Sequence, residues 1–388
     1  MKKEKQLDYL IALLIFINIY PVFIFSHYLP LPGNFVQLAY YALMLMVLFL
    51  FGLPGKFETS LVFVVFAAVL SLLVNDVAEK YNAPLRLSLF VIVILSIGPL
   101  LYNATLVRFR KLLYEKLMLI FMWIGGVSFF CLLGLPTFGI GHFSGLLAHS
   151  MLLAPVASLG GLYAFSKCIN AEKRQKKLFF GLFGLNTVCV IYASSRSALA
   201  AYVFGFIIYL LLSHFAWRKS LIVVLGIFAL FLSISSDDQT QIQPSSEGDT
   251  VFSRDMEENT RENLWNDRIA EFNSSPLVGV GFAVQSDAVN DQVAEDEEGR
   301  VEPGSTYLMV LSMTGSIGGF AFLVFLIKPL LSQKFWQQVI YAQPDKMAAF
   351  AFFMVHFFAE GYIFAAGSLL AFTFWLLMGV IYPYKGVN

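Results

Sequence analysis

Long apolar runs recur from one end of this 388-residue chain to the other. Each run has about 17–25 residues, the length that a helix needs to cross roughly 30 Å of hydrocarbon. In lipid the backbone must satisfy its own hydrogen bonds, so runs of this kind span the membrane as helices. Hydrophobic residues make up 58% of the chain and charged residues 13%, which excludes an ordinary soluble domain. We therefore predict an all-α polytopic membrane protein.

About 12 transmembrane helices are expected. Their predicted ranges are 9–29, 35–53, 59–75, 85–104, 117–135, 146–166, 178–194, 197–215, 220–235, 305–327, 347–362 and 366–383. Lys and Arg concentrate in the cytoplasmic connections of membrane proteins, so their distribution tests this order independently. Alternate connections hold 19 of the 26 basic residues. The opposite side holds only Lys80, Arg86, Arg196, Arg254, Arg261, Arg268 and Arg300. Both termini are therefore expected in the cytoplasm.

A polar segment, residues 236–304, interrupts the apolar pattern and is expected on the outer side. It holds 17 acidic residues, four arginines and no lysine or cysteine. Such a segment repels nucleic acid, and no disulfide can staple it. The chain is therefore predicted to have three parts: residues 1–235 with transmembrane helices 1–9, the large periplasmic loop 236–304, and residues 305–388 with transmembrane helices 10–12. The first apolar run lacks a cleavage site and is expected to stay as a span. Because metal-binding spacings and nucleotide fingerprints are missing, we expect no cofactor and no metal.

Within the loop, the spacing of apolar residues predicts a helix over about 255–272. One face of it carries Arg261, Leu264, Trp265, Arg268 and Phe272. The pair Ser275-Pro276 should end this helix, because the residue before a proline avoids the α region. Gly279 and Gly281 should then permit a tight return of the backbone.

Cations in this pattern suit phosphate chemistry. Arg196 lies in the short connection Ser194–Ser197, where a guanidinium can grip a diphosphate bidentately. The alternative is an arginine that reaches to lipid headgroups. Arg261 and Arg268 could bind phosphate while Trp265 stacks on a sugar or a lipid tail. The alternative there is an amphipathic helix resting on the membrane surface.

Two residues are candidates for a general base. Glu302 lies just before the chain re-enters the membrane, where partial desolvation favours proton uptake by a carboxylate. His149 opens the sixth predicted span, and a hydrogen-bonded packing role is the alternative for it. Glu360 in the last outward turn is a weaker site candidate. The connection from Asp76 to Arg86 is interpreted as an ordinary external loop.

The order of these motifs resembles the bacterial O-antigen ligase and polymerase superfamily. Ser195-Arg196-Ser-Ala-Leu-Ala is similar to its S-R-small-small element. Arg261-x-x-x-Trp265 followed by Pro276-Leu-Val-Gly279-Val-Gly281-Phe looks like its R-x-x-x-W … P-L-x-G-x-G signature, located in a large periplasmic loop. Tyr307-Leu-Met-Val-Leu-Ser-Met-Thr-Gly315-Ser-Ile-Gly318 resembles the span that follows. The likeness covers roughly residues 140–330.

The resemblance implies a metal-independent, membrane-embedded glycosyltransferase of the GT-C-like type in the bacterial cytoplasmic (inner) membrane. Its substrates would be oligosaccharides on undecaprenyl diphosphate, and its surroundings membrane lipids, with a chain-length regulator as a further partner. Residues matching Arg196 and Arg261, joined by Arg268, would bind the diphosphate. Trp265 and Tyr307 would contact the sugar or the lipid.

One departure separates polymerase from ligase. Ligases carry a His-Asn pair just before the tyrosine, whereas this chain has Gly304-Ser305-Thr306-Tyr307. An acid followed by G-S-x-Y-L is more typical of polymerases, so Glu302 is the predicted base and His149 the second choice. The favoured function is polymerisation of O-antigen or a related polysaccharide. The alternatives are a ligase acting on lipid A core or protein, a transporter or flippase of lipid-linked oligosaccharide, and a non-catalytic assembly partner.

Overall fold

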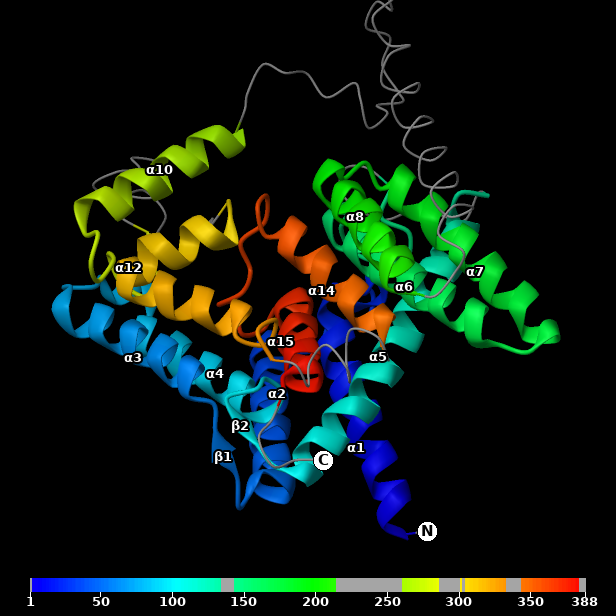
Figure 1. The fold of residues 1–388 in the computed structure, drawn as a ribbon, viewed down its shortest axis with the longest axis horizontal. Helices are drawn as coiled ribbons and strands as arrows, with labels where there is room; N and C mark the ends of the chain where they lie inside the picture. Colours follow the sequence, from blue (N-terminus) through cyan, green and yellow to red (C-terminus); the bar gives the residue numbers. More distant parts are fainter. Residues whose placement is uncertain are drawn as a thin grey trace, which may run out of the picture.

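Helices hold most of the residues that the computed structural model describes (Figure 1). Those residues are 2–133, 143–213, 260–285, 301, 304–332 and 343–383, with only the backbone described for Lys2, Lys3, Glu4, His27, Thr260 and Arg261. The α-helices are α1 (Lys2–Ile19), α2 (Gly33–Val47), α3 (Thr59–Val74), α4 (Ala83–Ser96), α5 (Ala104–Cys131), α6 (Ser150–Asn170), α7 (Lys173–Tyr192), α8 (Arg196–Leu212), α10 (Thr260–Ser274), α12 (Thr306–Ile327), α14 (Pro344–His356) and α15 (Leu369–Ile381). Shorter elements are η1 (Tyr20–Val22), η2 (Ile24–His27), η3 (Leu48–Gly52), η4 (Glu79–Tyr81), β1 (Lys56–Phe57) and β2 (Leu101–Tyr102).

The helices agree with the predicted membrane spans. A helix lies in eleven of the twelve predicted ranges, and the remaining range, 220–235, lies outside the described residues. By length and composition, five described helices can cross a membrane: Lys5–Val22, Gly33–Gly52, Ala104–Cys131, Ser150–Asn170 and Thr306–Ile327. The prediction of a multi-pass helical membrane protein is confirmed, while the number 12 stays a prediction.

The outer surface of the helices is apolar. Phe49 is 82% exposed, Leu73 79% and Phe320 70%, and many other large apolar side chains face outward. Water-soluble monomers rarely expose apolar patches of this extent. Hydrocarbon is the solvent that such a surface requires.

Helix α15 lies in the middle of the molecule (Figure 1). All of its residues, Leu369–Ile381, are buried, as expected of a helix that is apolar on every side. Trp375 is fully buried, and its indole Nε1 donates to the carbonyl oxygen of Ile363 at 2.9 Å. The edges of Phe90 and Phe374 meet the same indole. This central helix thereby orders the segment that precedes it.

The remaining helices pack around α15 in pairs. Helix α6 packs against α5 and α7, α14 packs against α8, and α3 packs against α12. Helix α10 packs on α12 at one end of the molecule. The two-stranded hairpin β1–β2 lies at the opposite end, with Lys56 paired to Tyr102 and Phe57 to Leu101 (Figure 1). The loop helix and the hairpin therefore mark opposite faces.

Arg110 is one of the basic residues on the predicted cytoplasmic side, yet its side chain is fully buried. Its Nε donates to the carbonyl oxygen of Ser96 at 3.1 Å, and its Nη2 donates to those of Leu95 and Leu101 at 2.9 and 2.8 Å. Carbonyl groups at a helix C-terminus lack intrahelical donors. Arg110 thus caps α4, in addition to any contribution to topology.

Candidate functional site

Helix α12 is broken at Gly315. This residue has φ 63° and ψ −169°, a conformation outside the helical region and almost restricted to glycine. The turn that follows α10 enters the break. The Val280 amide donates to the carbonyl oxygen of Ser312 at 2.8 Å, and the Ser316 amide donates to that of Pro276 at 2.8 Å. The loop backbone therefore replaces hydrogen bonds that an unbroken helix would make internally.

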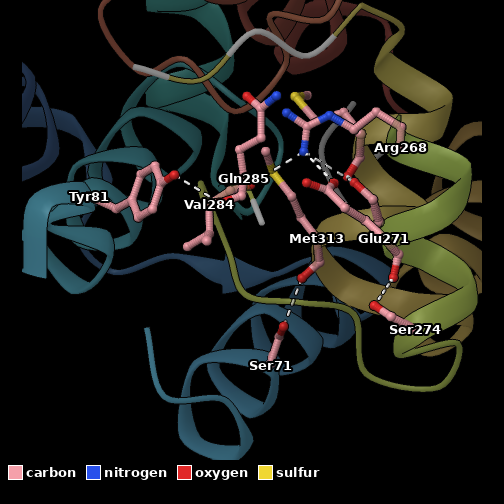
Figure 2. Close-up of polar contacts among 10 residues, drawn as sticks. Ser71, Tyr81, Arg268, Glu271, Ser274, Val284, Gln285 and Met313 are labelled. Atoms are coloured by element: carbon pink, nitrogen blue, oxygen red, sulfur yellow. Dashed lines mark hydrogen bonds and ion pairs between the residues drawn. The ribbon is translucent and has the colours of Figure 1, made fainter. Parts of the chain in front are cut away.

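Two further hydrogen bonds satisfy backbone groups of α12 at this break. The Ile317 amide donates to the carbonyl oxygen of Leu277 at 3.3 Å. The Ser71 hydroxyl, from α3, donates to the carbonyl oxygen of Met313 at 2.7 Å (Figure 2). Irregular backbone is tolerated at membrane depth only where protein satisfies its polar groups. The turn and α3 supply those partners here.

Gly279 and Gly315 are required because the backbone of the turn and the backbone of α12 approach each other closely. Gly279 has φ +75° and lies against Met313, so a Cβ there would overlap the Met313 backbone. A Cβ on Gly315 would overlap the carbonyl group of Leu277. Gly281 also has a positive φ, +126°. The predicted tight return at Gly279 and Gly281 is confirmed, and its partner is the broken helix.

The connection between α3 and α4 holds the same turn in place. Asn75 Nδ2 donates to the carbonyl oxygen of Gly279 at 2.9 Å. The Tyr81 hydroxyl donates to that of Gln285 at 2.8 Å (Figure 2). The interpretation of this connection as an ordinary loop is wrong, because it fixes both ends of the turn. The sequence offered no signal beyond polar residues in a short connection.

Helix α10 confirms the predicted loop helix, with bounds Thr260–Ser274 instead of 255–272. It ends directly before Ser275-Pro276, as the proline rule required. Arg268, fully buried on this helix, donates Nη1 to Glu271 Oε2 at 2.7 Å. The same nitrogen lies 3.3 Å from the carbonyl oxygen of Val284 and 3.4 Å from Ser312 Oγ (Figure 2). Arg268 thereby ties α10 to the turn and to α12.

This geometry bears on the diphosphate role expected for Arg268. Its side chain has no exposed surface, and its Nη1 already contacts Glu271, Val284 and Ser312. A diphosphate could reach it only after Glu271 and the turn had moved. In the conformation described, Arg268 positions the site and does not present a charge to a ligand.

Arg196 is differently placed. It is the first residue of α8, and its side chain is exposed. The Ser195 side chain caps the helix by accepting from the Ala198 amide at 3.4 Å, and Ser194 has φ +56°. Among the described residues Arg196 forms no ion pair. A guanidinium at a capped helix N-terminus joins its own charge to the positive end of the helix dipole, an arrangement suited to an anion.

Residues 181–323 match the model of a protein family described as O-Antigen ligase. The matched region contains α8, α10, the inserted turn and most of α12. This match supports the resemblance of the chain to the O-antigen ligase and polymerase superfamily. A search of curated proteins found no match. The match, together with the apolar helices, indicates a glycosyltransferase-like enzyme of a membrane that acts on O-antigen.

The start of α12 contains the positions where the resemblance places a ligase His-Asn pair. Ser305 and Thr306 are buried there, and both side chains donate to backbone carbonyl groups. The Tyr307 hydroxyl does the same at 2.9 Å. The acceptors of Ser305, Thr306 and Tyr307 are, in that order, the carbonyl oxygens of Phe357, Glu360 and Met354. These hydroxyl groups fasten α12 to the end of α14.

The remaining predicted site residues on the loop are Trp265, Arg261 and Glu302. Trp265 is 38% exposed on α10 and lies beside Gly304, because a Cβ on Gly304 would be 3.3 Å from Trp265 Cδ1. Arg261 belongs to α10, with only its backbone described, and Glu302 lies outside the described residues. The structure therefore brings Trp265 to the segment just before α12, whereas α8, which begins with Arg196, lies on the other side of α15 (Figure 1).

His149 is the N-cap of α6. Its Nδ1 accepts from the Met151 amide at 3.1 Å. A neutral histidine that accepts at Nδ1 carries its proton on Nε2. His149 could therefore act as a base only after releasing this cap, which weighs against its use as the alternative to Glu302.

The buried pair Arg268–Glu271 leads to a direct prediction. We expect Arg268→Met to lower the free energy of unfolding by about 3–5 kcal/mol, because it leaves the Glu271 carboxylate buried without its cation. The measurement is the melting temperature of the purified protein in detergent. The double variant Arg268→Met/Glu271→Met should recover much of the loss, since both charges are then removed.

The same variants separate a positioning role from ligand binding. If the double variant regains both stability and glycan transfer, Arg268 positions the turn. Recovery of stability without transfer would contradict that assignment and support direct contact with the diphosphate. Arg174→Met, at an exposed position on α7, serves as the control for loss of a charge.

Proposed function

We propose that the protein polymerises O-antigen or a related surface polysaccharide. A growing glycan on undecaprenyl diphosphate is transferred to the terminal sugar of a new lipid-linked repeat unit. The reaction takes place at the periplasmic face of the bacterial inner membrane, with both termini in the cytoplasm. The match to the O-antigen ligase family model supports the general reaction, and the polymerase assignment is our own step.

The proposed chemistry is a single displacement with inversion. The acceptor hydroxyl attacks the anomeric carbon of the donor glycan, and a new glycosidic bond forms as the bond to the diphosphate breaks. Glu302 takes the proton of the hydroxyl. Arg196 and Arg261 stabilise the charge that develops on undecaprenyl diphosphate as it leaves. Trp265 and Tyr307 border the path of the sugar and lipid.

The observation that carries the polymerase assignment is the start of α12. Ser305 and Thr306 occupy the positions of the expected ligase pair, and both are bound to backbone carbonyl groups at 3.1 and 2.7 Å. Neither hydroxyl can serve as a base at neutral pH. The base must then come from elsewhere, and Glu302 stands three residues before Ser305.

The matched family, described as O-Antigen ligase, supports a second candidate function, that of a ligase. In that case the same donor is transferred to lipid A core or to a protein hydroxyl. The two reactions share the donor and differ in the acceptor. They therefore differ in what accumulates when the protein is missing.

The glycan ladder of intact cells tests the proposal. Cells lacking the protein would be complemented with wild type, Arg261→Ala or Glu302→Gln. We expect the deletion strain and both variants to carry single repeat units on the acceptor, because capping continues while elongation stops. Protein levels in the membrane must match wild type for the comparison to count.

Other ladder patterns would overturn parts of the proposal. A deletion strain with long chains on the lipid carrier and a bare acceptor would establish a ligase. A full ladder from Glu302→Gln would move the base to another residue, with His149 next. Glu257→Gln, in the same acidic loop, is the control for loss of one carboxylate.

A further inference from the structure

An apolar groove lies between α7 and α8. These two helices follow each other in the chain, yet α7 packs mainly against α5 and α6, and α8 packs mainly against α14. The sides that α7 and α8 turn toward each other are therefore only partly closed. The lining includes Phe183, Thr187 and Ile191 from α7, and Leu199, Tyr202 and Val203 from α8.

The surface of this groove suits hydrocarbon. Thr187 and Tyr202 are the polar residues of the described lining. The Thr187 hydroxyl donates to the carbonyl oxygen of Phe183 at 2.9 Å, and the Tyr202 hydroxyl lies 2.8 Å from Thr187 Oγ1. Both hydroxyl groups are thus engaged within the protein. A polar ligand would lose its hydration here without full compensation, whereas an apolar chain would lose nothing.

The groove opens on the side of α7. Ile191 is 39% exposed, whereas Leu199 and Phe206 on α8 are buried and form the floor. Both helices lie in predicted transmembrane ranges, 178–194 and 197–215. The opening is therefore expected to face the hydrocarbon of the bilayer. A lipid chain could enter it sideways, without crossing water.

Arg196 lies at the outer end of the same face of α8. Leu199 and Val203 follow Arg196 by three and seven positions, a spacing that places all three on one side of the helix. The rise from Arg196 to Phe206 is about 15 Å, half of the roughly 30 Å of hydrocarbon in a bilayer. An exposed cation thus adjoins an apolar groove about as long as one leaflet is thick. A ligand with an anionic head and an apolar chain matches this arrangement.

We propose that the groove between α7 and α8 binds the first part of the polyprenyl chain of the undecaprenyl diphosphate whose head contacts Arg196. This inference rests on the proposed function, in which Arg196 stabilises the leaving diphosphate. A chain held in the groove keeps the head beside Arg196 during transfer, because free lateral movement of the lipid would separate the two. An ordinary phospholipid is the other occupant that the experiment must distinguish.

A photoactivatable lipid tests the inference. The probe is undecaprenyl diphosphate without sugar, carrying a diazirine near the diphosphate end of its chain. Full-length protein in liposomes would be irradiated with it, and the labelled residues would be identified by mass spectrometry. We expect label on both α7 and α8 at the groove. Unlabelled undecaprenyl diphosphate should remove this label, and an equal amount of phosphatidylglycerol should not.

Variants of the head contact and of the groove should both weaken labelling. Arg196→Ala should lower the affinity for the probe roughly tenfold to a hundredfold, the effect of losing charge-assisted hydrogen bonds. Val203→Trp should fill the groove and lower it roughly tenfold, as expected when about two CH₂ groups lose their burial. Ile191→Trp should act in the same way. Its position at the open side requires little repacking, so it keeps the test valid if Val203→Trp fails to fold.

Val69→Trp is the matched control. Val69 is an exposed valine on α3, which lies on the other side of α15 from α7 (Figure 1). This variant introduces the same side chain at a lipid-facing position far from the groove. Its labelling should equal that of the wild type.

Three results would overturn the inference. Wild-type affinity in both Ile191→Trp and Val203→Trp, with binding that still depends on Arg196, would exclude the groove and leave the proposed function intact. Label found only outside α7 and α8 would do the same. Equal competition by phosphatidylglycerol would identify a general lipid groove. A wild-type protein that binds no undecaprenyl diphosphate in native mass spectrometry would instead contradict the proposed function itself.

Discussion

Gly315→Ala is expected to prevent the protein from folding to a stable form. The alanine would have to adopt a φ and ψ that are almost restricted to glycine, and its Cβ would overlap the carbonyl group of Leu277. Strain and overpacking together should lower the free energy of unfolding by about 3 kcal/mol or more. That is a large share of the stability of a typical domain. Membrane protein level and melting temperature in detergent are the measurements.

Two further variants complete this experiment on the contact between the turn and α12. Gly279→Ala should behave like Gly315→Ala, since its Cβ would overlap the Met313 backbone across the same contact. Gly184→Ala, in an exposed part of α7 with open surroundings, should leave the melting temperature unchanged or slightly higher. Normal stability of Gly315→Ala would mean that the turn does not enter the helix as described.

Arg196→Ala should have the largest effect on activity without an effect on folding. The side chain is exposed at the start of α8 and forms no ion pair with another described residue, so its removal leaves no buried group unpaired. If it stabilises the departing diphosphate, transfer should slow by about 10²–10³-fold, as when one preorganised electrostatic partner is lost. The initial rate of glycan transfer, at matched protein level and melting temperature, is the measurement.

Conservative replacement sharpens this prediction. Arg196→Lys keeps the charge but loses bidentate geometry, so its rate should lie between those of wild type and Arg196→Ala. Arg174→Ala, exposed at the start of α7, should transfer at the wild-type rate. A wild-type rate for Arg196→Ala would instead favour the interpretation that this arginine only reaches to lipid headgroups.

Hydropathy predicted most of the architecture because lipid imposes a strict requirement on the backbone. Spans could be placed from apolar length alone. The central position of α15, the hairpin β1–β2 and the break in α12 could not be predicted in this way. Helix α10 and its end at Ser274 followed from periodicity and from Pro276. Rules that consider only a few neighbouring residues were sufficient for these helices, because the residues that determine them are neighbours in the sequence.

The site could be predicted only in part, since its main contacts join distant segments. Gly279 and Gly315 are both recognisable in the sequence, but no neighbouring residue indicates that the turn and α12 contact each other at these glycines. Glu271, the partner of Arg268, is one of 17 acidic residues in the loop, and nothing in the sequence indicates that it is buried. The sequence predicts Arg86 as part of an external connection, whereas the structure places it in the wall of a cavity formed with α2, α12 and the segment before α15. Long-range packing decided each of these roles.

Reconstitution tests the central claim most directly. The purified protein would be placed in liposomes with one substrate, the repeat unit on undecaprenyl diphosphate, and no other acceptor. The polymerase account predicts lipid-linked products of two, three and more repeats, with release of one undecaprenyl diphosphate for each bond formed. Products that arise only after lipid A core or an acceptor protein is added would contradict it and establish a ligase.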